Sequence, residues 1–240
     1  VGVLGSAYSM VDEQRRPIKT IIMPETDTEI RWMSLFQTPI VHGTLCFRNS
    51  ILSQNEIRYQ SKFGKGTEDY DFVNRLLEHT CGANLPDSLL EYRIHSSNIS
   101  KKNAKEMFLN HLSVSAEKVK RDIGHYPEGE YAHRDLLQML LEGSASYRAL
   151  GTRRYAAIQY WLSTWQTYSN GVTNIPASLL RALSLKAGNM LMYPPFYHGW
   201  FEAACDLSKL DPFWWIKFLI ALPASVQSWA QNRKYQKIRT

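Results

Sequence analysis

The stretch Gly66-Thr67-Glu68-Asp69-Tyr70-Asp71-Phe72-Val73-Asn74-Arg75-Leu76-Leu77 joins a glycine loop, an acidic cluster and a helical apolar pattern. Three carboxylates, those of Glu68, Asp69 and Asp71, fall within four residues, and apolar residues at helical spacing follow them. Thr67 precedes the acids and is of a residue type that favours the N-cap of a helix. The sequence therefore predicts a helix that carries its acids in the first turn, at the mouth of a loop.

Two explanations of these acids stay open. Acids in a first turn complement the helix dipole by up to about 1 kcal/mol each, and this accounts for most such clusters. Alternatively, one carboxylate is a general base held above a substrate cleft. Asp71 is expected to pair with Arg75 at i,i+4 instead of contacting a substrate. The aromatic, basic loop 58–66 before the helix is either a lid that orders over a substrate or an ordinary surface loop.

The composition is that of a globular protein with a basic excess. The chain has 240 residues, of which 44% are hydrophobic and 21% charged, enough for one large domain or two small ones. The net charge of +6 suits an anionic partner, such as a nucleotide diphosphate, nucleic acid or an acidic membrane surface. The three cysteines are far apart and match no disulfide or metal-site spacing, which favours a reducing compartment, the cytoplasm.

The chain divides into two parts by its patterns. Within 1–102, strand patterns at 1–11, 18–23, 41–48 and 85–95 alternate with short helices, one of which Thr26 or Asp27 can cap. From 103 the strand patterns disappear, and helical stripes follow, with a break near Gly151. The sequence thus predicts an α/β part over 1–102 and an all-α helical domain over 103–240. The first residues resemble no secretory signal and read as a strand within a longer protein.

Four segments of the first part carry a resemblance. In chain order they are similar to the second half of a family 2 glycosyltransferase catalytic domain, of the nucleotide-diphospho-sugar (GT-A) type. The resemblance covers about 100 of the 240 residues and implies a partial GT-A domain with a Rossmann-like mixed sheet. The segments are Val1-Gly2-Val3-Leu4-Gly5-Ser6, His42-Gly43-Thr44-Leu45-Cys46-Phe47-Arg48, Gly66-Thr67-Glu68-Asp69-Tyr70-Asp71-Phe72 and Tyr92-Arg93-Ile94-His95-Ser96-Ser97-Asn98-Ile99-Ser100.

The resemblance implies a reaction and a set of site residues. A sugar would pass, with inversion, from a nucleotide-diphosphate donor to the hydroxyl of a glycan, a lipid-linked sugar or a protein, as in polysaccharide biosynthesis. Asp69 would be the general base, and Glu68 would orient the acceptor hydroxyl. Mg²⁺ or Mn²⁺ would bind the diphosphate, with His95 as a candidate metal ligand. The residues expected at the substrate are His42, Gly43, Thr44, Arg48, Arg93 and His95. Arg93 and His95 alternate in the last predicted strand, so they are expected on the same strand face.

The chain also departs from the family pattern. The family's Asp-x-Asp metal motif has no counterpart, because the acidic cluster at Glu25, Asp27 and Glu29 follows a strand instead of preceding it. The Gln-x-x-Arg-Trp signature of processive synthases is absent after the acidic helix. We therefore expect a non-processive transferase whose nucleotide-binding half is missing here, so that this chain is inactive in isolation. The alternative is a non-catalytic helical interaction or membrane-docking module on a degenerate transferase remnant.

The C-terminal stretch 213–239 combines a Trp-rich apolar segment with a basic tail. The apolar segment 213–222 is too short to span a bilayer, which takes roughly 18 residues or more. Two interpretations remain open: an interfacial anchor at the inner face of the membrane, or a helix buried in the helical domain with a solvated tail. Nucleic acid is not an expected partner, because the chain contains no recognition motif for it.

Overall fold

The computed structural model describes residues 1–63, 66–96, 98, 103–124, 130–191, 204, 207 and 208. The chain forms two compact units, 1–126 and 127–240. Each unit is described by itself. None of the described helices combines the length and the apolar character that crossing a bilayer requires.

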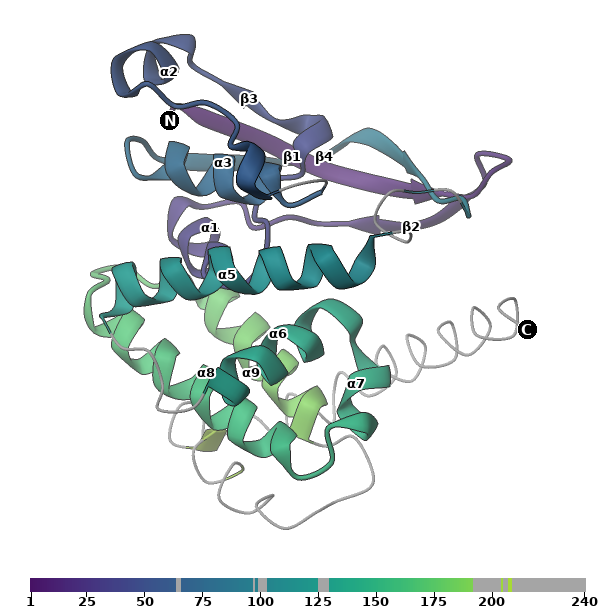
Figure 1. Cartoon of the computed structure of the whole chain (residues 1–240), viewed down its shortest axis with the longest axis vertical. Helices are drawn as coiled ribbons and strands as arrows, with labels where there is room; N and C mark the ends of the chain where they lie inside the picture. The colour runs from purple at the N-terminus through teal and green to yellow at the C-terminus, as the bar shows by residue number, and fades with distance from the viewer. Residues whose placement is uncertain are drawn as a thin grey trace. The chain divides into compact units, whose positions relative to one another are not determined.

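A mixed four-stranded sheet organises the first unit (Figure 1). Its strands are β1 (Val3–Val11), β2 (Pro17–Ile21), β3 (Cys46–Phe47) and β4 (Gly82–Arg93). β1 is the common partner: it pairs antiparallel with β2 and β3, and parallel with β4. The parallel register runs from Val3 opposite Gly82 to Val11 opposite Arg93. The predicted α/β character of the first part is confirmed.

Helices cover the start of β1 and form the core of this unit. Val3 is fully buried, and it packs with Ile30, Ile51 and Leu76 of three different helices. The α1 helix begins as the sequence predicted, because Thr26 and Glu29 form a capping box. The helical elements are α1 (Asp27–Ser34), η1 (His42–Thr44), α2 (Asn49–Asn55), η2 (Ser61–Phe63), α3 (Glu68–Leu77) and α5 (Ala104–Ile123).

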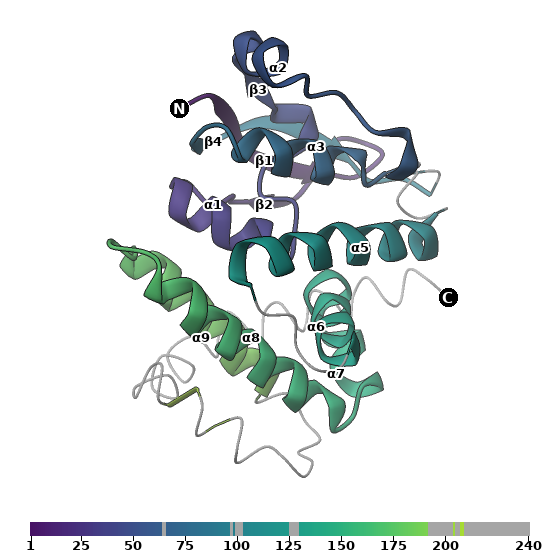
Figure 2. The same cartoon turned by 60° about the vertical axis from the view of Figure 1, so that its left-hand side comes forward.

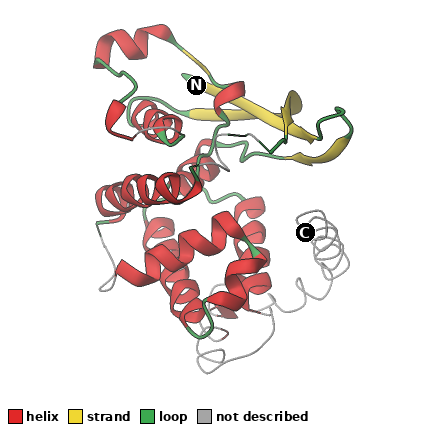
Figure 3. Ribbon diagram, turned by 45° about the vertical axis from the view of Figure 1, so that its right-hand side comes forward, coloured by secondary structure: helices red, strands yellow, loops and turns green. Residues whose placement is uncertain are grey.

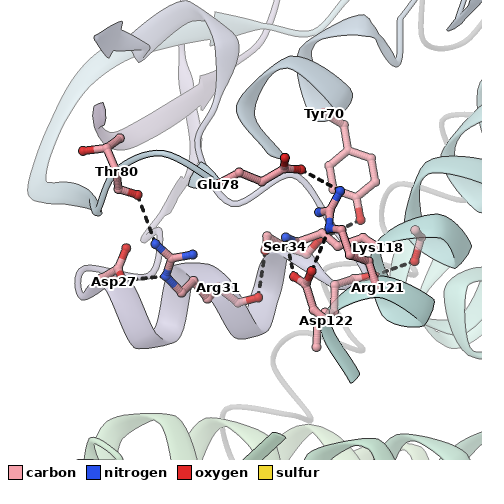
Figure 4. A network of polar contacts seen from close by, with 11 residues as sticks. Asp27, Arg31, Ser34, Tyr70, Glu78, Thr80, Lys118, Arg121 and Asp122 are labelled. Atoms are coloured by element: carbon pink, nitrogen blue, oxygen red, sulfur yellow. Dashed lines mark hydrogen bonds and ion pairs between the residues drawn. The ribbon is translucent and has the colours of Figure 1, made fainter. Parts of the chain in front are cut away.

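α5 belongs to the first unit and runs alongside α1 and α3 (Figure 2). Polar contacts tie the three helices together (Figure 4). The hydroxyl of Tyr70 on α3 donates to the carbonyl of Ser34 on α1 at 2.8 Å, and Arg121 of α5 pairs with Glu78 at 2.6 Å. Tyr70 also stacks on His111 of α5, with ring centroids 4.3 Å apart. The helix α3 is therefore held from two sides.

The predicted strand over 41–48 is wrong except at Cys46 and Phe47. The segment starts instead as the 3-10 turn η1, which the Thr44 hydroxyl closes by donating to the carbonyl of Val41 at 2.9 Å. The N–H of Ser6 in β1 in turn donates to the Thr44 hydroxyl at 3.2 Å. The Thr44 side chain thus accepts a hydrogen bond from a β1 N–H that would bond to a neighbouring strand in a regular sheet. The apolar pattern of the sequence does not indicate this side-chain contact.

The described elements of the second unit are all helices (Figure 3). They are α6 (Glu130–Glu142), α7 (Ser144–Ala149), α8 (Arg153–Asn170) and α9 (Ala177–Leu191). Leu136 and Leu137 of α6 and Ile158 of α8 are fully buried. The predicted break near Gly151 is confirmed, since α7 ends just before this residue and its φ of +56° suits glycine. The prediction for 213–239 lies outside the described residues.

Candidate functional site

The first turn of α3 is firmly fixed, but Thr67 does not cap it. Phe72 of the second turn is 1% exposed and belongs to the core. Thr67 occupies the N-cap position, yet its hydroxyl donates to the carbonyl of Met107 at 3.3 Å. The carboxylate of Glu68 instead accepts from the N–H of Gly66. Glu68 therefore fastens the loop that precedes the helix.

Asp71 has a structural role. Its carboxylate pairs with Arg75 at 2.6 Å, which confirms the predicted i,i+4 pair, although Asp71 is only 8% exposed and not on the surface. The same guanidinium donates to the carbonyl of Arg58 at 2.6 Å. The pair thus anchors the segment around Arg58 against α3, where the next residue is Tyr59.

Asp69 is partly exposed, as is Glu68, whereas Asp71 is buried. Burial is the largest influence on the carboxyl of Asp69 and raises its pKa above the usual value. The N–H of Tyr70, 2.8 Å from Oδ1, and the charge of His42 act in the opposite direction, while the negative charge of Glu68 adds to the rise. A carboxylate with a raised pKa binds a proton more tightly than an ordinary surface aspartate does.

His42 and Tyr59 lie beside these acids. His42 Nε2 and the hydroxyl of Tyr59 are 3.0 Å apart in a hydrogen bond, and the rings meet edge to face with centroids 5.9 Å apart. Burial raises the pKa of Tyr59, and the negative charges of Asp69 and Glu68 raise it further. Residues from η1, the loop before η2 and the start of α3 therefore gather in one place.

The other predicted substrate residues of the 42–48 segment contact neighbouring parts of the first unit and have structural roles. Gly43 passes close to β4, since a Cβ there would lie 2.8 Å from Cδ2 of Leu90. Thr44 closes η1, as described above. The side chain of Arg48 donates to the carbonyl of Val1 at 3.1 Å, and its N–H donates to the carbonyl of Gly2. Arg48 thus fastens the strand start.

Arg93 and His95 do not share a strand face, contrary to the prediction. β4 ends at Arg93, and His95 lies in a turn in which its N–H donates to Oδ1 of Asn98 at 2.6 Å. Arg93 pairs with Val11 at the end of β1. Arg48 lies near the opposite end, because the residue before it pairs with Val3 at the start of β1. At about 3.3 Å per strand residue, the two arginines are anchored roughly 25 Å apart. The predicted substrate residues therefore do not form a single cluster.

No metal-binding group appears among the residues that the structure describes. No set of three or more His, Cys, Asp or Glu side chains there could hold a metal ion. His95 as a metal ligand stays a prediction.

Tyr59 is the site residue that the sequence reasoning missed. The sequence marks the loop 58–66 by its aromatic and basic residues, but no local pattern distinguishes Tyr59 within it. The available signal was a tyrosine in a loop directly before an acidic helix start. Its pairing with His42 bridges 17 residues of sequence and could not be read from local spacing.

One comparison with known proteins gives a match. The chain is 25% identical over 121 residues to a protein of Haemophilus influenzae described as an uncharacterized glycosyltransferase. The match covers 50% of this chain and 33% of that protein, so the chain spans about a third of the relative's length. No family model and no solved structure matches the chain.

Proposed function

We propose that this chain is the acceptor-side part of a glycosyltransferase. The observation that carries the proposal is the half-buried carboxylate of Asp69, which lies beside Glu68 and the hydrogen-bonded pair of His42 and Tyr59. The similarity to the Haemophilus influenzae protein supports it. Acids that only complement a helix dipole need no such pair beside them, and this favours a catalytic role over a non-catalytic docking module.

The proposed reaction is a direct displacement with inversion. The acceptor hydroxyl gives its proton to the Asp69 carboxylate while its oxygen bonds to the anomeric carbon of the donor sugar. The bond from that carbon to the diphosphate oxygen breaks, and the diphosphate leaves with the electron pair. Because the pKa of Asp69 is raised, its carboxylate is a stronger base than an exposed aspartate at the same pH. Glu68 holds the loop and orients the acceptor.

The resemblance extends the proposal beyond the acids. It suggests a GT-A architecture, a nucleotide-diphospho-sugar donor, and Arg93 and His95 on the donor diphosphate, where a guanidinium suits phosphate oxygens. It also suggests Mg²⁺ or Mn²⁺. The described residues contain no group of three or more His, Cys, Asp or Glu side chains for such an ion, so the proposed steps do not involve a metal. We place the protein in the cytoplasm, at the inner face of the membrane, with 213–239 as the candidate contact.

The test is a transfer and donor-hydrolysis assay on the full-length parent protein, with a panel of nucleotide sugars and Mn²⁺. We expect Asp69→Asn to lower turnover by about a hundredfold or more, because general base catalysis contributes on that order. Glu117→Gln, which removes an exposed carboxylate from α5, is the matched control and should leave turnover unchanged. Full activity in Asp69→Asn would reduce Asp69 to a helix-start acid, and an inactive parent would end the proposal.

A further inference from the structure

Three aromatic rings form a cluster at the edge of the candidate site. Phe72 is its buried centre, 1% exposed. Tyr59 lies flat on Phe72, with centroids 4.1 Å apart and planes 16° apart, while Phe47 meets Phe72 edge to face at 5.6 Å. Tyr59 is 47% exposed and Phe47 is 36% exposed. A buried ring thus carries two rings that face solvent.

Tyr59 is held in place by three independent contacts. Phe72 covers one face of its ring, so the opposite face contributes to its exposed surface. His42 fixes its hydroxyl at 3.0 Å. The preceding residue, Arg58, is tied to α3 through the guanidinium of Arg75. A single exposed aromatic residue needs no explanation, but one that is oriented by a buried ring, a histidine and a backbone anchor offers a pre-formed flat surface.

The chemistry beside this surface narrows what fits on it. The carboxylates of Glu68 and Asp69 lie close enough to influence the phenol of Tyr59. A ligand of this place therefore has an apolar face for the ring and hydroxyl groups at its edge for the carboxylates. A pyranose ring has both, because its C–H groups form a flat apolar face while its hydroxyls project around the rim. An alkyl alcohol has no flat face of C–H groups with hydroxyls around its edge, and a serine side chain has no ring.

We infer that Tyr59 is an acceptor-positioning residue, and that the acceptor of the proposed reaction is a pyranosyl sugar whose apolar face lies on its ring. The inference rests on the proposed function and, of the three acceptor classes, favours a glycan or a lipid-linked sugar over a protein side chain. Tyr59 orients the sugar so that one rim hydroxyl points at Asp69, and it does not itself take part in bond making. Phe47, which also packs against Phe72, extends the apolar surface toward the next unit of a glycan.

The first test separates acceptor from donor kinetics in the full-length protein. The acceptors are the methyl glycosides of glucose, galactose, mannose and N-acetylglucosamine, with glycerol as an acyclic comparison. Tyr59→Leu should raise the KM for the glycoside about five- to tenfold and leave the donor KM unchanged, since an aromatic contact contributes on that scale. Tyr59→Phe keeps the ring and should retain acceptor KM within about twofold. Tyr131→Leu, at a 70% exposed tyrosine of α6, is the matched control.

An unchanged acceptor KM in a folded Tyr59→Leu protein would overturn the inference, and so would an equal rise in the donor KM or a preference for glycerol. The thermal unfolding midpoint of each variant shows whether it folds. If Tyr59→Leu does not fold, the comparison between Tyr59→Phe and Phe47→Leu takes its place. Phe47→Leu should then raise the KM for a disaccharide glycoside more than that for a monosaccharide glycoside, and equal effects would overturn the inference.

A second measurement keeps the inference separate from the proposed function. Saturation-transfer NMR with the same glycosides, without donor, detects which sugar protons touch the protein. We expect the strongest transfer to the C–H protons of one ring face, and its loss in Tyr59→Leu but not in Tyr131→Leu. If the protein shows this pattern but turns over no donor, the transferase proposal is contradicted and the sugar-binding surface is confirmed. No saturation transfer in the unaltered protein would overturn the inference.

Discussion

Two histidine–tyrosine pairs, one in each unit, have almost the same geometry. His42 and Tyr59 are 3.0 Å apart with rings at 71°, and His133 and Tyr160 are 2.9 Å apart with rings also at 71°. Their surroundings differ. His133 is 0% and Tyr160 5% exposed between α6 and α8, whereas Tyr59 is 47% exposed and lies beside two carboxylates.

The geometry of a histidine–tyrosine pair does not by itself reveal the role of the pair. In the buried pair neither polar group is open to water, and burying a polar group without a hydrogen bond is costly. The bond between the two rings avoids that cost. In the exposed pair, water can replace either partner, and the bond adds little net stability. What it does add is the orientation of a ring beside Asp69. We therefore assign the buried pair to stability and the exposed pair to the candidate site.

The largest expected difference comes from removing each histidine. His133→Ala should lower the free energy of unfolding by about 2–4 kcal/mol, because it leaves a cavity and removes a buried hydrogen bond. His42→Ala should lower it by less than about 1 kcal/mol, because its site is open to water. Urea unfolding followed by circular dichroism measures both. A larger loss in His42→Ala would mean that the exposed pair is structural.

Removing only the tyrosine hydroxyl should produce a smaller difference in unfolding free energy between the two pairs. Tyr160→Phe should cost about 1 kcal/mol of unfolding free energy, the net contribution of a buried hydrogen bond, and Tyr59→Phe only a few tenths. The two changes are identical in chemistry and differ only in burial, so each is the control of the other. Equal costs in the same unfolding experiment would show that exposure does not separate the two pairs.

The smallest effect is on the pH dependence of stability, and it tests the acids near each pair. Burial raises the pKa of Asp69, and it also raises the pKa of Asp135 on α6, where the charges of Arg153 and Arg134 oppose the rise. An acid with a raised pKa holds its proton longer in the folded state. Its contribution to stability therefore falls as the pH rises from about 3.9, the unfolded value, through the folded pKa.

Asp69→Asn and Asp135→Asn should therefore both flatten the decline of stability between about pH 4 and 7, the range above the unfolded carboxyl pKa. The charge of His42 and the N–H of Tyr70 oppose the effect of burial at Asp69, and the charge of Arg153, 3.2 Å away, opposes it at Asp135. Unfolding free energies at three pH values suffice. A steeper decline in either variant would contradict the direction of the shift.

Local signals in the sequence predicted local structure well. The capping of α1 by Thr26, the pairing of Asp71 with Arg75 and the helix break near Gly151 were all visible as short-range patterns. Each depends on residues at most a few positions apart, where spacing fixes the geometry. The helix start that carries Glu68 and Asp69 was predicted for the same reason.

Contacts between distant segments could not be predicted in the same way. The strand expected over 41–48 became a turn because the Thr44 hydroxyl bonds within the turn and to β1. The face expected to join Arg93 and His95 does not exist, because β4 ends between them. Tyr59 reached the site only through His42 and Phe72, neither of which is its neighbour in sequence.

The parallel pairing of β1 with β4 has a consequence for how this unit folds. Ser9 and Ser88 bond across the pair although 79 residues separate them. Closing so long a loop is an entropic cost that must be met before the strand contacts form, and topologies dominated by such contacts fold slowly. His42, Tyr59 and Asp69 all lie within that loop. The loop that carries the candidate site is therefore closed by strand pairing of long sequence separation, a kind of contact that forms slowly in folding.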